Sequence, residues 1–398
     1  MNAPQRPLYV WQQAAWPDWH YDDKALIVPL AQARQQQGIV VGKAQAIGLE
    51  SDNLTSVVNE IWVQEVMATA AIEGQKLDLE QVRSSVMRKL GLAGAGPSSR
   101  HVDGLVDVMH DASQHFALAL DADRLCRWQS ALFPGGTSGI QRIEVGKFRT
   151  FQEPMQIISG AIGKEIVHYR APDSAQVPIE MARFLAWFNQ PCQADGIVRA
   201  AIAHLWFETI HPFEDGNGRV GRAIMDMAIA QDARQQARLY SMSRQLQENR
   251  SAYYDALNHA QKGELDITPW LIWFVMQFSA ACLKSGLLID KALEKARYWS
   301  THANQDFNQR QRKTLQKLLD AGDGGFLGGL STDKYSKITG ASKATASRDL
   351  SDLLQKGALI SRGVGKATKY FVNVPEWHHL AQPPLPHNAN DNEQTDAD

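Results

Sequence analysis

The chain has 398 residues, a length that predicts two or three domains. Its hydrophobic share of 44%, charged share of 21% and formal net charge of -2 exclude a disordered chain and indicate a soluble globular protein. No uninterrupted apolar run reaches about eighteen residues, and the polar N-terminus lacks the core of a signal peptide. Three widely spaced cysteines match no metal or disulfide pattern, so we expect a reduced, cytoplasmic protein without a membrane.

The first hundred residues are predicted to be helical, because apolar residues such as Val57, Ile61 and Val66 recur at helical spacing. Glycine-rich breaks follow at 91–99 and 134–138. Between Val145 and Ala171 the composition changes to β-branched and aromatic residues among glycines, which predicts a short β-hairpin. Helical patterning then returns in four segments, Ile179–Phe188, Ile197–Ile210, Val220–Ala233 and Ile267–Leu288.

A long helical connector is predicted over 291–319, and it leads into the Gly/Asp-rich stretch 320–329, near which we place a domain boundary. The last eighteen residues, 381–398, are polar and rich in Pro, Asn and Asp. We therefore expect a disordered tail.

The segment Ile210–Arg222, Ile-His-Pro-Phe-Glu-Asp-Gly-Asn-Gly-Arg-Val-Gly-Arg, joins two apolar helices through a glycine-rich turn. Pro212 prevents the first helix from continuing, and Gly216 and Gly218 allow conformations and close approaches that side chains forbid. Their N–H groups and the positive end of the following helix are predicted to bind an anion.

Charged side chains around this turn point to phosphoryl-type transfer. Arg219 and Arg222 are three residues apart, so both can face one side of the helix's first turn and bind a polyphosphate. Asp215 supplies an oxygen ligand for Mg²⁺, and the imidazole of His211 suits a base acting near neutral pH.

The segment resembles the Fic-family signature His-x-Phe-x-Asp-Gly-Asn-Gly-Arg-x-x-Arg at every specified position. The resemblance implies an adenylyltransferase that uses ATP and Mg²⁺ to move AMP onto a Ser, Thr or Tyr hydroxyl of a target protein. It implies that His211 deprotonates that hydroxyl, Asp215 binds the metal and Arg222 pairs with the terminal phosphate. The implied ATP-binding residues of the motif are Gly216, Asn217, Gly218, Arg219, Val220, Gly221 and Arg222.

Two further segments resemble parts of that family. The segments 146–149 and 155–169 look like the flap that lays the target beside the active site by strand addition. Residues 250–263 look like the wall of the adenine pocket, where Tyr254 would contact the base. Ordinary helix packing of Tyr253 and Tyr254 is an equally open reading.

Thr69-Ala-Ala-Ile-Glu-Gly74 resembles the family's inhibitory motif. A Glu73 carboxylate paired with Arg222 would occupy the guanidinium that the γ-phosphate needs. The resemblance therefore implies that Glu73 holds the enzyme in check. The same Glu73 could instead serve removal of AMP, and this alternative stays open.

The C-terminal region is predicted as a helix at 314–319, helices at 332–339 and 343–355, and strands at 358–362 and 368–372. This order resembles a winged helix-turn-helix. From Ser331 to Asn373, eight Lys and Arg stand against three Asp, which favours nucleic acid, while docking of a protein or a homodimer stays open.

We thus expect a mainly α-helical protein: an N-terminal helical domain (1–100), a Fic-type core with a β-hairpin flap (101–290), a helical linker (291–312) and a winged helix (313–375). The expected function is AMP transfer restrained by Glu73. The alternatives are an AMP-removing enzyme, and a DNA-binding regulator that uses the core as a nucleotide sensor.

Overall fold

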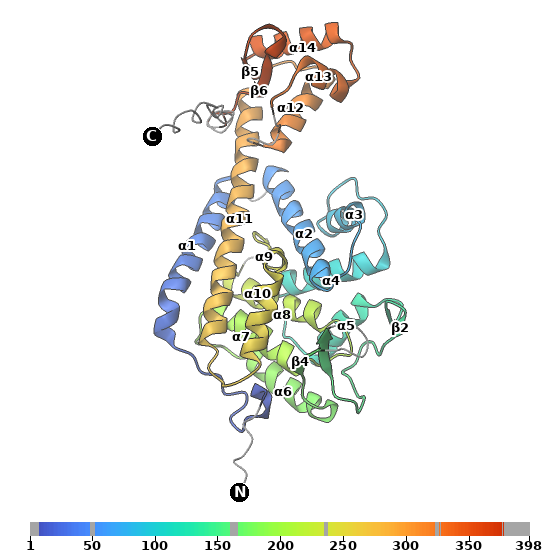
Figure 1. Ribbon diagram of the computed structural model, residues 1–398, viewed down its shortest axis with the longest axis vertical. Helices are drawn as coiled ribbons and strands as arrows, with labels where there is room; N and C mark the ends of the chain where they lie inside the picture. The colour runs from blue at the N-terminus through green and yellow to red at the C-terminus, as the bar shows by residue number, and fades with distance from the viewer. Residues whose placement is uncertain are drawn as a thin grey trace, which may run out of the picture. The chain divides into compact units, whose positions relative to one another are not determined.

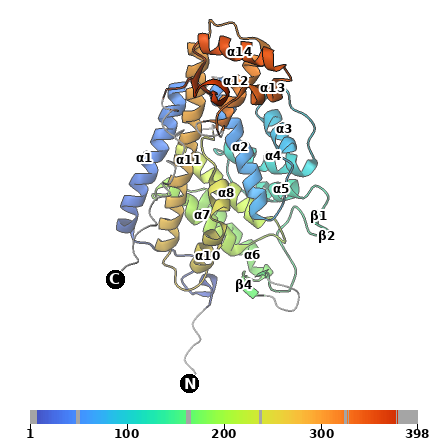
Figure 2. The ribbon, with the colours of Figure 1, turned by 45° about the horizontal axis from the view of Figure 1, so that its top comes forward.

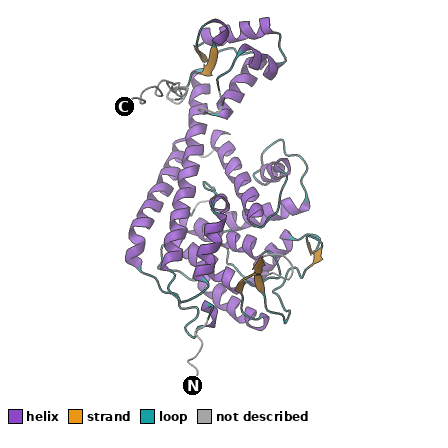
Figure 3. Ribbon diagram, in the orientation of Figure 1, coloured by secondary structure: helices purple, strands orange, loops and turns teal. Residues whose placement is uncertain are grey.

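The computed structural model describes residues 8–47, 52–159, 166–234, 238–322, 326, 328–375 and 377. The chain divides into two compact units, Met1–Ile289 and Asp290–Asp398, which we describe separately. Both consist mainly of helices, as the sequence predicts (Figure 3). The tail at 381–398, expected to be disordered, lies outside the described residues.

Unit 1 contains most of the helices (Figure 1). They are α1 (Asp23–Ile47), α2 (Asp52–Ile72), α3 (Leu79–Lys89), α4 (Arg100–Gln114), α5 (Ala122–Leu132), α6 (Val177–Phe188), α7 (Gly196–Ile210), α8 (Asn217–Ala233), α9 (Met242–Glu248), α10 (Arg250–Ala260) and α11 (Thr268–Thr301), whose last turns belong to unit 2.

Helices α7 and α8 pack against each other in the core of unit 1. Asp195 caps α7 by accepting a hydrogen bond from the main-chain N–H of Ile197, and every residue from Ile197 to Ile210 except Arg199 is buried. Helices α2, α4 and α5 pack on α8, while α1 and α11 run side by side in both views (Figures 1 and 2). The motif between α7 and α8 is therefore held by buried helices on both sides.

Two antiparallel hairpins complete unit 1. The hairpin predicted between Val145 and Ala171 is present as β3 (Gln156–Ser159) and β4 (Ile166–Arg170). The second, β1 (Thr137–Ser138) with β2 (Gln141–Arg142), was not predicted. The N-terminal segment packs on β4, where the indole N–H of Trp11 donates to the carbonyl of Arg170 at 2.9 Å.

Helix α11 is, by length and composition alone, apolar enough to cross a membrane. Polar residues such as Gln277 and Ser279 interrupt its apolar run, so a search for uninterrupted runs does not find it. The same test is passed by core helices, and Trp270, Phe274 and Phe278 of α11 are buried within unit 1. Trp270 also donates a hydrogen bond to the carbonyl of Ala201 on α7.

Unit 2 has the element order that the sequence predicts: α12 (Gln309–Ala321), α13 (Thr332–Thr339), α14 (Lys343–Gln355), β5 (Leu359–Arg362) and β6 (Lys369–Val372). Its core is formed by residues such as Leu315, Leu319, Tyr335, Leu350 and Leu353. The predicted continuous connector over 291–319 is wrong. Helix α11 ends at Thr301, and α12 begins anew because the Asn308 side chain caps it by accepting from the N–H of Gln311.

Candidate active site

The turn between α7 and α8 begins at His211, which has a left-handed backbone with φ of 52°. A non-glycine residue adopts this conformation only where its surroundings hold it. The buried Arg149 does so, since its guanidinium donates to the carbonyls of His211 (2.8 Å), Ile210 (3.3 Å) and Pro172 (2.5 Å). The backbone N–H of Arg149 also donates to Pro212. His211 is thus fixed at the end of α7 by a buried cation.

The rest of the turn is shaped by Asn217 and Gly216. The Asn217 amide accepts from the N–H of Phe213 and donates to its carbonyl, both at 2.8 Å. Gly216 has φ of 92°, and a Cβ there would lie 2.9 Å from the ring of Phe133. Asn217 therefore acts as a clamp on the turn, and Gly216 is required by both conformation and space.

The turn opens on a cavity of about 480 Å³ between α7, α8, α10, the β3–β4 hairpin and the end of α2. Its lining residues are Glu73, Ile157, Ile158, His168, Tyr169, Glu208, His211, Gly218, Arg222, Arg250, Ser251, Tyr253, Tyr254, Asp255, Leu257, Asn258 and Gln261. His211, Gly218, Arg222, Tyr254 and Glu73, all singled out in the sequence, are brought together here.

Burial controls the two titratable groups at the end of α7. Burial, assisted by the positive charge of Arg149, lowers the pKa of His211 to about 4, so its imidazole is neutral at physiological pH. Burial raises the pKa of Glu208 to about 8. The Glu208 carboxyl lies 3.7 Å from Nδ1 of His211. A neutral imidazole in this place can accept a proton.

The guanidinium of Arg222 is hydrogen bonded to the segment that carries Glu73. Its guanidinium donates to the Glu73 carboxylate at 2.7 Å, to the Thr69 hydroxyl at 2.7 Å and to the Thr69 carbonyl at 3.1 Å. Burial acts to raise the pKa of Glu73, but the charge and hydrogen bond of Arg222, together with the charge of Arg219, outweigh it, so the pKa of Glu73 is lowered. Glu73 also lies over the start of α8, because a Cβ on Gly218 would be 2.2 Å from its Oε1.

Arg219 and Asp215 lie beside the cavity and are not among the residues that line it. Arg219 donates to the side chain of Gln75 at 3.2 Å, and its guanidinium lies 3.5 Å from Asp215. Asp215 also accepts hydrogen bonds from the Ser138 hydroxyl and from the N–H of Gly216. Both motif arginines therefore contact residues of the 69–75 segment.

The two adjacent tyrosines of α10 have different surroundings. Tyr253 is buried, and its hydroxyl lies 2.8 Å from Nε2 of His204 on α7. Tyr254 is 40% exposed, faces the cavity and lies under the guanidinium of Arg250 at 5.5 Å. Core packing thus applies to Tyr253, while Tyr254 forms part of the cavity wall.

The remaining motif residues, Val220 and Gly221, are buried in the α7–α8 contact. A Cβ on Gly221 would lie 2.4 Å from the Glu208 carboxyl, so this glycine makes room for it. Sequence reasoning did not single out Glu208, and it gave Arg149 only a place in the flap. A signal for Glu208 existed, since it is the one carboxylate in the mainly apolar stretch Ile197–Ile210.

Comparison with known families identifies two regions of the chain. Residues 119–229 match the model described as the Fic/DOC family, and residues 9–92 match a domain of unknown function, DUF4172. Protein adenylyltransferase Fic from Culex quinquefasciatus is 26% identical over 235 residues, which is 57% of this chain and 41% of that protein. Protein adenylyltransferase fic-1 from Caenorhabditis briggsae is 27% identical over 225 residues, 54% of this chain and 40% of that protein. The chain therefore spans about two-fifths of the length of these relatives.

A solved structure shares the fold. A Fic family protein from Desulfovibrio desulfuricans aligns over 89% of this chain and 97% of its own, with a TM-score of 0.52 and 20% identity. At this identity the likeness establishes the fold alone.

Proposed function

Residues 119–229 of this chain form a Fic/DOC domain homologous to protein adenylyltransferases, and from that premise we propose that the protein transfers AMP from ATP to a hydroxyl of a target protein. At the level of the family, the homology supports an enzyme of the nucleotidyltransferase type. The observation that carries the proposal is the placing of His211, Gly218 and Arg222 in one cavity at the start of α8.

In the proposed reaction the target hydroxyl attacks the α-phosphorus of ATP, and pyrophosphate leaves. His211 accepts the hydroxyl proton, since its imidazole is neutral at physiological pH. The first-turn amides of α8 and the guanidinium of Arg222 bind the phosphates, and Tyr254 contacts the adenine. Much of the acceleration must come from holding the hydroxyl in line with the leaving oxygen.

The surroundings of Asp215 fit a magnesium ion held mainly by phosphate oxygens. The carboxylate is 38% exposed and lies at the start of α8. Within the described ranges no cluster of three or more His, Cys, Asp or Glu could hold a metal unaided. Mg²⁺ commonly binds to one carboxylate together with phosphates and water, and there it would neutralise phosphate charge. The contribution of this chain is the single carboxylate of Asp215.

We further propose that Glu73 restrains this activity. Its carboxylate accepts a hydrogen bond from the guanidinium of Arg222. A γ-phosphate could therefore not pair with the same side of that guanidinium. ATP bound under this constraint would present a displaced α-phosphorus, and a displacement of about 1 Å can cost roughly 10²-fold in rate.

Replacement of Glu73 tests the proposal. The Glu73→Gly variant is expected to incorporate α-labelled AMP into protein about 10²-fold faster than wild type, because Arg222 is released. Addition of His211→Ala to Glu73→Gly is expected to abolish labelling while nucleotide binding persists. Unchanged or lower labelling by a folded Glu73→Gly protein would reject the inhibitory role. Labelling that survives without His211 would reject the mechanism.

A second candidate is the removal of AMP, which is favoured by the presence of the Glu73 carboxylate in the same cavity as His211. Wild-type protein incubated with a pre-modified target distinguishes the two directions. Release of free AMP that depends on Glu73 would support removal as the main reaction.

A further inference from the structure

The β3–β4 hairpin beside the active-site cavity is too small to be stable by itself. Its strands have four and five residues, and a single two-stranded hairpin is marginally stable at best in water. Ile157 and Tyr169, which are paired in its register, line the cavity. The position of this cavity wall is therefore set by what packs against the hairpin.

Residues 9–13, which we call the N-terminal brace, supply such packing (dark blue in Figure 1). The brace and the hairpin share a separate apolar cluster of Tyr9, Trp11, Met155, Ile157, Tyr169 and Ala171. The rings of Tyr9 and Tyr169 meet edge to face with 5.2 Å between their centroids. This arrangement of rings adds to the stabilisation that burial provides. The hairpin thus has its small core in common with the brace.

The brace also covers part of the outer edge of β4. The N–H of Ala171 donates to the carbonyl of Met155. The adjacent pair, Gln156 and Arg170, is therefore a non-hydrogen-bonded one, and the carbonyl of Arg170 points away from β3. The indole N–H of Trp11 donates to that carbonyl at 2.9 Å. The brace thus satisfies a main-chain acceptor of the hairpin and closes this part of the edge to another strand.

The hairpin in turn contacts the end of α7 that carries the catalytic turn. The hydroxyl of the buried Tyr169 donates to the carbonyl of Thr209 at 2.6 Å. Carbonyls in the last turn of a helix have no intrahelical donor, so Tyr169 satisfies one that α7 leaves open. Thr209 is two residues before His211. A continuous path of contacts therefore runs from Tyr9 through Tyr169 to the residue proposed as the base.

The other side of the brace is attached to the end of α10. The N–H of Val10 donates to the carbonyl of Gln261 at 3.1 Å, and Tyr9 forms an antiparallel bridge with Lys262. Gln261 is itself one of the residues that line the cavity. The brace therefore joins two walls of the cavity, the hairpin and α10.

We propose that the N-terminal brace positions the acceptor substrate of AMP transfer, by holding the β3–β4 hairpin at a fixed distance from His211. The inference rests on the proposed function and assigns Tyr9 and Trp11 as positioning residues. Neither is among the residues that line the cavity, so both act through the hairpin and not by touching a substrate. The 9–92 region, which matches a domain of unknown function, thus contacts the site twice, through the brace and through Glu73.

The test compares Trp11→Phe with Trp16→Phe in the full chain carrying Glu73→Gly. Both changes remove one indole N–H donor from the same N-terminal segment, but Trp16 donates to the Glu180 carboxylate of α6 at 2.8 Å and not to the hairpin. Hydrogen exchange followed by mass spectrometry, without nucleotide, reports on the hairpin directly. The amides of β3 and β4 are expected to exchange about 3–10-fold faster in Trp11→Phe, the effect of losing one hydrogen bond, and to be unchanged in Trp16→Phe.

Labelling then tests the acceptor role. Incorporation of α-labelled AMP is measured against increasing amounts of protein from a cell lysate, and mant-ATP fluorescence measures nucleotide binding. For Trp11→Phe, the lysate concentration that gives the half-maximal rate is expected to rise about 3–10-fold, while the maximal rate and the Kd of mant-ATP stay within about twofold. A smaller folded fraction would instead lower the maximal rate and leave the half-maximal concentration unchanged.

Tyr9→Leu, which removes the ring that meets Tyr169 but keeps an apolar side chain, is expected to act in the same direction as Trp11→Phe. The proposal is overturned if hairpin exchange in Trp11→Phe matches that in Trp16→Phe, or if only the maximal rate of labelling falls. A Glu73→Gly parent that labels no protein would reject the proposed function and the acceptor role with it. In that case the exchange comparison separately decides whether the brace holds the hairpin.

Discussion

Several polar residues of the active-site turn bind the protein's own main chain. Both ends of the Asn217 amide are hydrogen bonded to Phe213, and the Arg149 guanidinium is bound to carbonyls and to the Ser174 hydroxyl. Neither residue lines the cavity. Their contribution is to hold His211 in its left-handed conformation and to aim the first turn of α8. A motif names such residues together with ligand-binding ones, because both kinds are required for the same site.

The effect of burial on the pKa of Glu208 can be measured through the pH dependence of the protein's stability. Burial, opposed by Arg222, raises its pKa from the ordinary 4.5 to about 8 in the folded chain. Since the folded state binds the proton more tightly than the unfolded state, this group lowers stability as pH rises through that window. Glu208→Gln has no such group. The melting temperature of the variant minus that of wild type is expected to increase by roughly 4 °C or more when the pH is raised from about 5 to about 8.

Thermal melts of both proteins at the two pH values check this expectation. Glu214→Gln, which removes a half-buried carboxylate of the same turn, is the control. A difference between Glu208→Gln and wild type that does not change with pH would contradict a raised pKa at Glu208.

At the site, the sequence could predict neighbours within the motif and could not predict most partners from elsewhere in the chain. The spacing of Arg219 and Arg222 follows from one turn of helix. The two hydrogen bonds from Arg222 to Thr69 join residues 153 positions apart, and only the packing of α2 on α8 creates them. The motif resemblance drew attention to Thr69 and Glu73, but it gave the Thr69 hydroxyl no partner.

Helix α2 contacts α8 and the start of α9 through residues four apart, which lie on one helical face. Thr69 contacts Arg222, and Glu73 follows just beyond the end of the helix. One turn earlier, the buried Glu65 accepts hydrogen bonds from Ser241 and from the N–H of Ser243, and lies 3.4 Å from Arg238. The contact between Glu73 and Arg222 is therefore the last of a series, and α2 as a whole positions Glu73.

Close helix packing gives a prediction for α4 and α5. A Cβ on Gly104 of α4 would lie 1.9 Å from the carbonyl oxygen of Ala131 on α5. Gly104→Ala must separate the two helices and is expected to cost about 1–3 kcal/mol or more. Gly38→Ala is the control: Gly38 is an exposed helical glycine of α1 with nothing within 4 Å of the added Cβ. It should stabilise by about 0.5–1 kcal/mol.

Urea unfolding of the two variants measures this contrast. Equal stability of Gly104→Ala and wild type would mean that the α4–α5 contact is looser than the distance implies.

Elements with clear caps were predicted well from sequence. Helices α13 and α14 begin after Ser331 and Ser342, whose hydroxyls accept from the first turn, and α13 ends at Gly340 with φ of 73°. The β1–β2 hairpin was missed, because strands of two residues have no periodicity to detect. The break after Thr301 was missed because the polar residues that follow contain no Gly or Pro.

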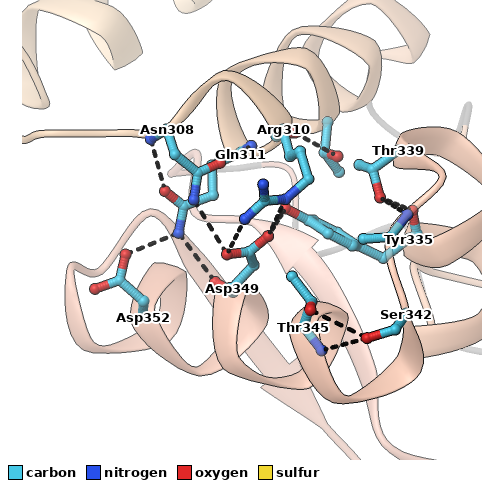
Figure 4. A network of polar contacts seen from close by, with 11 residues as sticks. Asn308, Arg310, Gln311, Tyr335, Thr339, Ser342, Thr345, Asp349 and Asp352 are labelled. Carbon is cyan, nitrogen blue, oxygen red and sulfur yellow. Dashed lines mark hydrogen bonds and ion pairs between the residues drawn. The ribbon is translucent and has the colours of Figure 1, made fainter.

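At the scale of the whole molecule, the division into two units predicts separable stabilities. Asp349 accepts hydrogen bonds from three side chains of unit 2 (Figure 4), so Asp349→Ala is expected to destabilise that unit by about 1–3 kcal/mol. AMP transfer in the Glu73→Gly background should be unchanged, because every cavity-lining residue belongs to unit 1.

Calorimetry checks this prediction, with one of two transitions expected to move. The unit-1 transition is the one raised by added nucleotide, and it should stay in place. A loss of transfer, or a shift of both transitions together, would show that the two units unfold cooperatively.

Glu73 and Arg222 belong to one polypeptide, and under the proposed restraint their contact has a consequence for how AMP transfer would be switched on. A tethered carboxylate meets its guanidinium at an effective concentration set by the geometry of α2, whatever the amount of protein in the cell. Dilution cannot release it, and a competing anion must exceed that local concentration. The activating event we expect is therefore mechanical, a displacement of α2 from α8.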